Sequence, residues 1–170
     1  MVNARNEAGD TALGLALFKG HAKVMQVLLE NGADAKLTPR SEGGGTFLHA
    51  AAAADVCSAA AISLLVESAG LSTEAHDADG RCALHVVART KTFDAAVRVK
   101  LFVLQGAAVD GADSAGMTAL HHAAEQGASE VLKQLLELGA DKGGTDKQGR
   151  TALEVAKQVS GDCFRPRACC

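Results

Sequence analysis

One short pattern recurs along most of this 170-residue chain and restricts the folds that are open to it. The pattern is a glycine, any residue, a small residue that is usually threonine, any residue and a leucine. Its five copies are Gly9–Leu13, Gly44–Leu48, Gly80–Leu84, Gly116–Leu120 and Gly149–Leu153. Successive leucines are separated by 35, 36, 36 and 33 residues. A period of this length predicts a stack of similar units whose neighbours bury one another's apolar faces.

Each of the first four units contains the pattern of two helices. Thr11 and its counterparts can cap a first helix. That helix is rich in alanine, which supplies 34 residues of the chain and favours close helix packing. After the first leucine, apolar residues return at helical spacing, as Val24, Val27 and Leu28 do, and the next three units repeat this. The second helices are expected to end at glycines, namely Gly32, Gly70, Gly106 and Gly139.

Composition argues against several classes of partner. The chain has 17 basic and 20 acidic residues, a formal net charge of −3 and no basic stripe, which disfavours binding to a nucleic-acid backbone. It has no Trp or Tyr, so base-stacking surfaces are not expected. The sequence shows no secretory signal and no apolar run of about 18 residues. Its five scattered cysteines favour a reducing compartment, so we expect an intracellular protein, cytoplasmic or nuclear.

The motif residues resemble the ankyrin repeat, whose signature is T-P-L-H-x-A. The matching segments are Thr46–Ala51, Cys82–Val87 and Thr118–Ala123. Further similarities are Gly20–His21, Gly32–Asp34 and Gly139–Asp141. The resemblance implies an all-α fold, an ankyrin-repeat solenoid of stacked helix-turn-helix units with β-hairpin or turn fingers. The proline of the signature is absent from every copy, so the helix starts lose a residue that presets the first turn.

The resemblance also predicts how the chain is organised. The ankyrin repeat domain is expected at 1–160, with repeats at 6–35, 41–75, 77–110 and 113–142, a half-repeat at 146–160 and a C-terminal tail at 161–170. Extra residues are placed in the inter-helix loops near Asp55–Ser58 and Thr90–Phe93. The apolar residues of the first helix are expected to face an absent neighbour or solvent: Leu13, Leu15, Leu17 and Phe18. This favours a longer protein or a fragment, with a native start as the alternative.

Histidine and cysteine are the candidates for chemistry. The resemblance implies that His49, His85 and His121 join neighbouring hairpins through hydrogen bonds. The sequence contains no Cys-x-x-Cys or His-Glu-x-x-His spacing for a metal, and Gly43–Thr46 lacks the lysine of a phosphate loop. Cys57 and Cys82 are interpreted as packing residues. We therefore expect no catalytic residue, no metal, no cofactor and no small-molecule substrate, and hence no enzyme.

The C-terminal tail is the one feature outside the repeat. Its last residues, Cys169 and Cys170, resemble the doubly prenylated ends of Rab-type small GTPases. The simpler interpretation is an incidental or truncated end, because two arginines add little attraction to a membrane. Membrane binding is therefore expected only if these cysteines are lipidated.

The resemblance finally implies a function. In ankyrin repeat proteins the fingers and first helices line a concave surface that binds proteins, so we expect a monomeric, non-catalytic module that binds a protein partner there. The alternative is a structural spacer or targeting segment of a larger multidomain protein. The surface positions implied are Glu7, Asp10, Phe18, Lys19, Glu42, Asp79, Arg81, Arg89, Thr90, Ser114, Met117, Glu125, Gln126, Lys147, Gln148 and Arg150. The anchors expected among them are Phe18, Arg81, Arg89, Met117 and Arg150, because aromatic, methionine and arginine side chains are enriched at binding surfaces.

Overall fold

The computed structural model describes residues 2–37, 44–54 and 59–162, and the regular structure of that part is helical. The helices are α1 (Ala12–Phe18), α2 (Ala22–Glu30), α3 (Phe47–Ala53), α4 (Ala59–Ser63), η1 (Leu64–Ser68, a π-helical turn), α5 (Ala83–Arg89), α6 (Ala95–Leu104), α7 (Ala119–Gln126), α8 (Ser129–Glu137) and α9 (Ala152–Asp162). Three fingers are closed by isolated antiparallel bridges: Arg5 with Thr11, Ala112 with Thr118, and Thr145 with Thr151.

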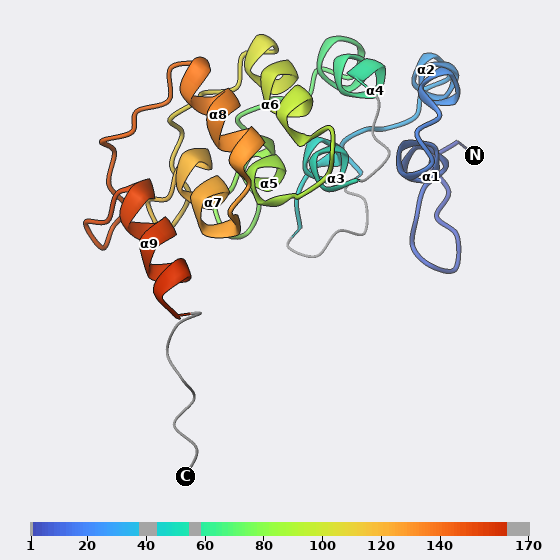
Figure 1. Ribbon diagram of the computed structural model, residues 1–170. Coiled ribbons are helices and arrows are strands. Elements are labelled where there is room, and N and C mark those ends of the chain that lie inside the picture. Colours follow the sequence, from blue (N-terminus) through green and yellow to red (C-terminus); the bar gives the residue numbers. More distant parts are fainter. Residues whose placement is uncertain (1, 38–43, 55–58, 163–170) are drawn as a thin grey trace.

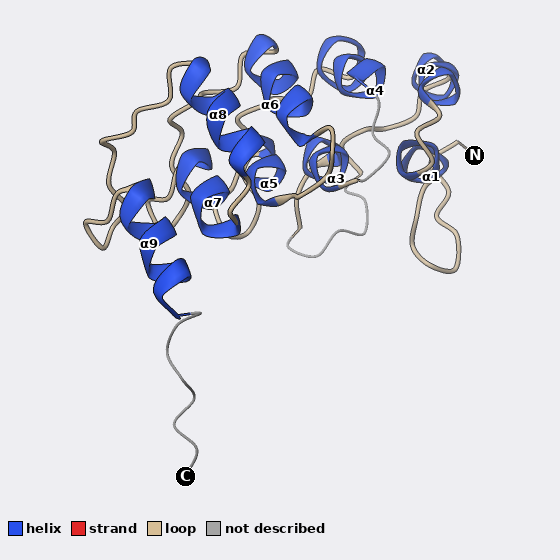
Figure 2. Cartoon of the chain, in the orientation of Figure 1, coloured by secondary structure: helices blue, strands red, loops and turns tan. Residues whose placement is uncertain are grey.

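The helices form two layers. The first helices of the repeats, α1, α3, α5, α7 and α9, follow one another in one layer, and α2, α4, α6 and α8 form the other (Figure 1). Loops join the two layers at both edges (Figure 2). Each described second helix ends at a glycine with positive φ, the left-handed conformation that closes helices. The predicted all-α solenoid is therefore confirmed.

The motif histidines connect neighbouring repeats. In the repeats that begin with Thr46, Cys82 and Thr118, the backbone N–H of the N-cap residue donates to the histidine Nδ1 three residues later, at 3.0 to 3.2 Å. Since Nδ1 accepts, Nε2 carries the proton of the neutral ring. Nε2 of His49, His85 and His121 then donates to a carbonyl in the next finger, at 2.8 to 3.0 Å. The expected hydrogen bonds between hairpins are confirmed.

The first repeat is joined to the second in another way. Gly14 occupies the position of the motif histidine, and the missing side chain leaves room for the Phe47 ring, which lies 3.7 Å from where a Cβ of Gly14 would be. The expectation for this helix was wrong for Leu13 and Leu17, which are fully buried in the core that includes Met25 and Phe47. Packing against α2 and α3 is enough to cover them, and only Leu15 and Phe18 of the four are exposed.

A buried arginine joins the second and third repeats. Arg98 of α6 is 2% exposed, and its guanidinium donates to the carbonyl oxygens of Ala52 at 2.9 Å and Ala54 at 2.8 Å, at the C-terminal end of α3. It also binds the Asp94 carboxylate at 3.1 Å and the Thr92 hydroxyl. These carbonyls have no partner within their helix, so Arg98 caps a helix in the preceding repeat. The repeat motif gave no indication of this role for Arg98.

The remaining structural expectations have different outcomes. The long loop at Thr90–Phe93 does lie between α5 and α6. The other expected insertion, Asp55–Ser58, lies outside the described residues, as do Glu42, Cys57 and the tail from Cys163 to Cys170. Helix α9 continues through Asp162, past residue 160, where the half-repeat was expected to end.

Candidate functional site

Each repeat contributes one finger residue and one first-helix residue to a shared surface. We call this surface the finger face and its two sets of positions the finger row and the helix row. One row takes the position three residues before each motif leucine: Asp10, Gly45, Arg81, Met117 and Arg150. The other takes the position five residues after it: Phe18, Ala53, Arg89, Glu125 and Gln158. Both rows belong to the surface that the resemblance predicts for partner binding.

The finger face contains a hollow over the second and third repeats. Its volume is about 250 Å³. Gly45, Ala53 and Val86 give part of its lining a small or apolar character. The polar and charged residues His49, Asp77, Arg81 and Arg89 line it as well. Thr90 lines it as well, but its hydroxyl donates to the carbonyl of Val87 at 2.8 Å, within its own helix end.

A second hollow of about 410 Å³ lies over the third and fourth repeats. Its lining brings together six of the residues predicted for binding: Asp79, Arg81, Arg89, Ser114, Met117 and Glu125. Arg81 and Arg89 line both hollows, so the two are neighbours on one surface. The structure thus gathers residues from three repeats that lie far apart along the chain.

Two of the expected anchors hold their own fingers together. Arg81 binds the Asp77 carboxylate through Nε at 3.0 Å and through a terminal nitrogen at 2.9 Å. Arg150 binds Asp146 in the same way, at 2.9 and 2.7 Å, and also donates to Gln158 at 2.8 Å. Each aspartate in turn accepts backbone N–H groups of its finger. Both guanidinium groups are therefore paired within their own fingers, and the role of the two arginines as anchors for a partner stays a prediction.

In the fourth repeat a histidine, and not an arginine, binds the aspartate of the finger. Met117 replaces the arginine and is only 9% exposed, so the expectation that it projects into solvent was wrong. The second oxygen of Asp113 is instead bound by Nε2 of His122 at 2.8 Å. Burial raises the pKa of Asp113, but hydrogen bonds from His122 and from the backbone of Met117 and Ala115 outweigh this and hold it below its usual value. His122 therefore has a structural role.

Burial of this histidine makes the stability depend on pH. Burial lowers the pKa of His122, and of the neighbouring His85, below the ordinary value of 6.5, although Asp113 partly opposes this. The unfolded chain therefore takes up protons at a pH where the folded chain does not, and acidification below about 6.5 lowers the free energy of unfolding. The slope is at most about 1.4 kcal/mol per pH unit for each imidazole. Urea unfolding at pH 7.5 and at pH 5.5 measures it.

Replacing His122 tests the assignment. The variant His122→Gln keeps an N–H donor for Asp113 but cannot be protonated, so we expect a smaller loss of stability between pH 7.5 and 5.5 than in the wild type. His21→Gln is the matched control, since His21 is exposed. An equal reduction in both variants would contradict the role of burial.

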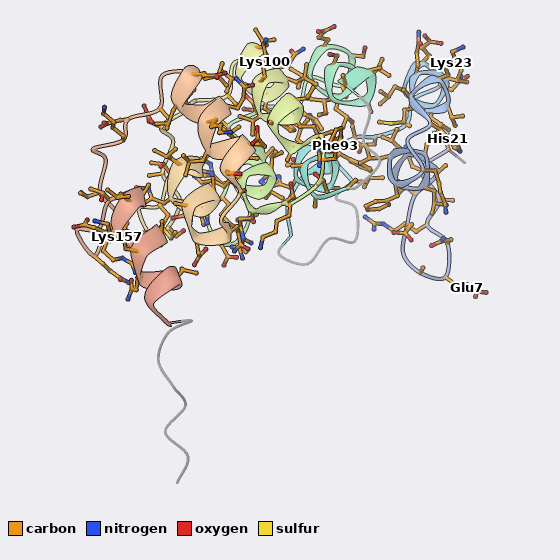
Figure 3. The ribbon with its side chains drawn as sticks, in the orientation of Figure 1. Glu7, His21, Lys23, Phe93, Lys100 and Lys157 are labelled. Carbon is orange, nitrogen blue, oxygen red and sulfur yellow. The ribbon has the colours of Figure 1, made fainter. Side chains whose placement is uncertain are left out.

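The other predicted surface residues are distributed along the finger face. Asp10 is half-buried, and Phe18 is 40% exposed at the end of α1. Glu7 extends from the first finger (Figure 3), and Lys19 and Gln148 are also exposed. Lys147 is exposed too, and its Nζ donates to the carbonyl of Ser114 at 2.6 Å. Gln126 is partly buried. Arg89 is exposed and forms no ion pair or side-chain hydrogen bond with the described residues.

Sequence reasoning missed the acidic residues at the base of the fingers. Asp77 and Asp146 each precede an arginine by four residues, and this spacing could have identified the ion pairs. It gives no signal for Asp113, whose partner His122 is nine residues away. Cys82 is buried, in agreement with its interpretation as a packing residue, and burial raises the pKa of its thiol.

Neither a metal centre nor a membrane span is present in the part of the chain that the structure describes. There, no group of three or more His, Cys, Asp or Glu side chains is placed to hold a metal ion. Among the same residues, no helix has the length and apolar character needed to cross a bilayer.

Comparison with known proteins identifies the family. The model for three copies of the ankyrin repeat matches residues 48–146 and 97–165, and the model for a single ankyrin repeat matches residues 8–38. The chain belongs to the ankyrin repeat family. Ankyrin repeats are in general non-catalytic modules for protein–protein interaction.

Similar ankyrin repeat chains occur within much longer proteins. The chain is 31% identical over 158 residues to the nuclear factor NF-kappa-B p105 subunit of Gallus gallus, covering 92% of this chain and 16% of that protein. It is 30% identical over 154 residues to the neurogenic locus notch homolog protein 1 of Xenopus tropicalis, covering 91% of this chain and 6% of that protein. The mouse notch homolog is 43% identical over 70 residues, which cover 41% of this chain and 3% of that protein.

Proposed function

We propose that this ankyrin repeat chain binds another protein through its finger face. The observation that carries the proposal is the pair of adjoining hollows over the second to fourth repeats, lined by fingers and first helices. The face also bears exposed side chains with little structural role. Phe18 is a large apolar side chain at the surface, and Arg89 has no partner among the described residues. Such residues are typical of the few positions that dominate the energy of an interface.

The proposal assigns different roles to the predicted surface residues. Phe18, Arg89 and Glu125 are assigned to contact with the partner, because none of them holds a finger together. Arg81 and Arg150 shape the face by holding their own fingers in place, through ion pairs with Asp77 and Asp146. Met117 forms part of the wall of the second hollow.

Affinity capture with a matched pair of variants tests the proposal. The test variant carries Phe18→Ala, Arg89→Ala and Glu125→Ala on the finger face. The control carries Lys23→Ala, Lys100→Ala and Glu137→Ala, exposed charges on the second helices; Figure 3 shows Lys23 and Lys100 on that layer. Proteins captured from a lysate of the source cells are identified by mass spectrometry, and their binding is measured with purified protein. Circular dichroism verifies that both variants are folded.

We expect the control to bind the partner like the wild type and the finger-face variant to bind at least about tenfold more weakly. A partner that is lost by the control and kept by the finger-face variant would contradict the proposal.

A second candidate is the spacer or targeting segment of a longer protein. It is favoured by an apolar hollow of about 190 Å³ between α7, α8 and α9, lined by Leu132, Leu136, Leu153 and Ala156. Leu153 is exposed there, and exposed apolar side chains gathered in one place are typical of surfaces that another unit covers. If the wild type captures no specific partner, this candidate is favoured.

A further inference from the structure

The shape of the first hollow follows from one glycine. A Cβ atom on Gly45 would lie 2.6 Å from Cγ of His49, the imidazole that connects the second and third repeats. No larger residue fits there without moving that ring, so this finger position has no side chain. The matching position on the helix row is Ala53, which is also small and exposed. The second repeat is therefore the place where the finger face has room for a side chain of a partner.

The charge beside this hollow is positive. Asp77 is 5% exposed, and its oxygens are occupied by the Arg81 guanidinium and by the backbone N–H groups of Asp79 and Arg81. Its negative charge is thus held within the finger. Arg89 lines the same hollow, is exposed, and has no ion pair with the described residues. The charge that a ligand meets here is that of Arg89.

The second hollow is lined by exposed carboxylates as well as by Arg89. The single guanidinium of Arg81 is shared by Asp77 and Asp79, and the Asp79 side chain remains 65% exposed. Glu125, on the helix row of the fourth repeat, is partly exposed and lies 3.8 Å from Nδ1 of His122. Both carboxylates line this hollow. The finger face therefore carries Arg89 in the third repeat, without an ion pair among the described residues, and the partly exposed carboxylate of Glu125 on the helix row of the fourth.

We propose that the finger face binds an extended segment of its partner that carries an acidic and a basic residue about three positions apart. This inference rests on the proposed function. The acidic side chain pairs with Arg89, an apolar side chain next to it occupies the hollow over Ala53 and Val86, and the basic side chain contacts Glu125 on the helix row of the next repeat. The spacing follows because packed helices lie about 10 Å apart, while an extended chain advances about 3.3 Å per residue.

A displayed library of random twelve-residue peptides tests the inference. The complete chain is panned beside three variants: Arg89→Glu, which reverses the free charge; Ala53→Trp, which fills the hollow; and Lys100→Glu, a matched charge reversal on the outer face of α6. Circular dichroism establishes folding, and Ala53→Gln replaces Ala53→Trp if the tryptophan variant is unfolded.

The expected result is specific to each variant. Wild type and Lys100→Glu select peptides with an acidic residue, an apolar neighbour and a basic residue about three positions away. Arg89→Glu loses the preference for the acidic residue and binds the wild-type peptides about tenfold more weakly. Exchanging that acidic residue for lysine restores binding to Arg89→Glu. Peptides selected by Ala53→Trp no longer show a preference for the apolar neighbour.

Other outcomes overturn the inference in distinguishable ways. If no sequence preference emerges, or Arg89→Glu selects the same peptides as the wild type, the charge assignment is wrong. If Ala53→Trp still abolishes binding in that case, the finger face remains the binding surface and the proposed function stands. If neither variant changes binding of the selected peptides, both the inference and the proposed function fail.

Discussion

Replacing Arg98 with alanine is expected to lower the free energy of unfolding by about 3–5 kcal/mol, since two buried or partly buried carbonyl groups lose their donor and a large buried side chain is removed. The change leaves the carbonyl groups of Ala52 and Ala54 at the end of α3 without their donor, whereas the Asp94 carboxylate, whose side chain is 39% exposed, stays solvated. It also opens a cavity between two repeats. Urea unfolding followed by circular dichroism measures the loss.

Two further variants separate the causes. Arg98→Lys keeps the charge but loses the fork that reaches several acceptors at once, so most of the loss should persist. Lys100→Ala lies two residues away on the same helix, is exposed, and is expected to change stability by less than about 0.5 kcal/mol. Equal stability of Arg98→Ala and Lys100→Ala would contradict the assigned role.

The Arg98→Ala substitution should also weaken the coupling between the second and third repeats. Arg98 belongs to the third repeat and caps a helix of the second, across 46 residues of sequence. Stability in a solenoid depends on the interfaces between nearest neighbours. We therefore expect unfolding of Arg98→Ala to become less cooperative, with the first two repeats separating from the rest.

Replacing Gly116 with alanine is expected to destabilise the protein by about 2–4 kcal/mol, because two costs combine at this residue. Its φ is +77°, a conformation that disfavours any residue with a Cβ. An added Cβ would also lie 2.8 Å from the backbone nitrogen of Lys147 in the next finger. That nitrogen donates to the carbonyl of Ala115 at 3.0 Å, so the substitution pushes neighbouring fingers apart. Thermal and urea unfolding measure the effect.

Gly149 supplies the control for this prediction. Its φ is +74°, close to that of Gly116, but an added Cβ would meet nothing within 4 Å. Gly149→Ala should therefore cost only about 1–2 kcal/mol, the price of the backbone conformation alone. The difference between the two variants measures the close approach of the fingers. If the two variants lose the same stability, close approach contributes nothing.

Most of the fold could be predicted because its determinants are local. The Thr that caps a first helix, the glycine that closes a second helix and the apolar stripe between them all act within one repeat. The five copies of the motif therefore predicted the helix pairs and their order. The hydrogen bonds of His49, His85 and His121 were predicted as well, although only through the resemblance to a known repeat.

Features that depend on contacts between repeats were harder to predict. Leu13 and Leu17 were expected to be exposed, but packing of α1 against α2 and α3 buries them. Met117 looked like a surface anchor because of its motif position, yet it is only 9% exposed. The type of a residue and its position in the motif do not reveal how much of its side chain is buried by neighbouring repeats.

The sequence by itself therefore determined the repeat, its helices and its family, because each motif encodes interactions among residues close together in the chain. Only the tertiary structure decided which charges remain free. Arg81, Arg98 and Arg150 are paired within the fold, whereas Arg89 lines the hollow over the second and third repeats without an ion pair among the described residues. The physical reason is that a charge is satisfied by whatever lies within a few ångströms in space, and stacking brings together groups that are far apart in sequence.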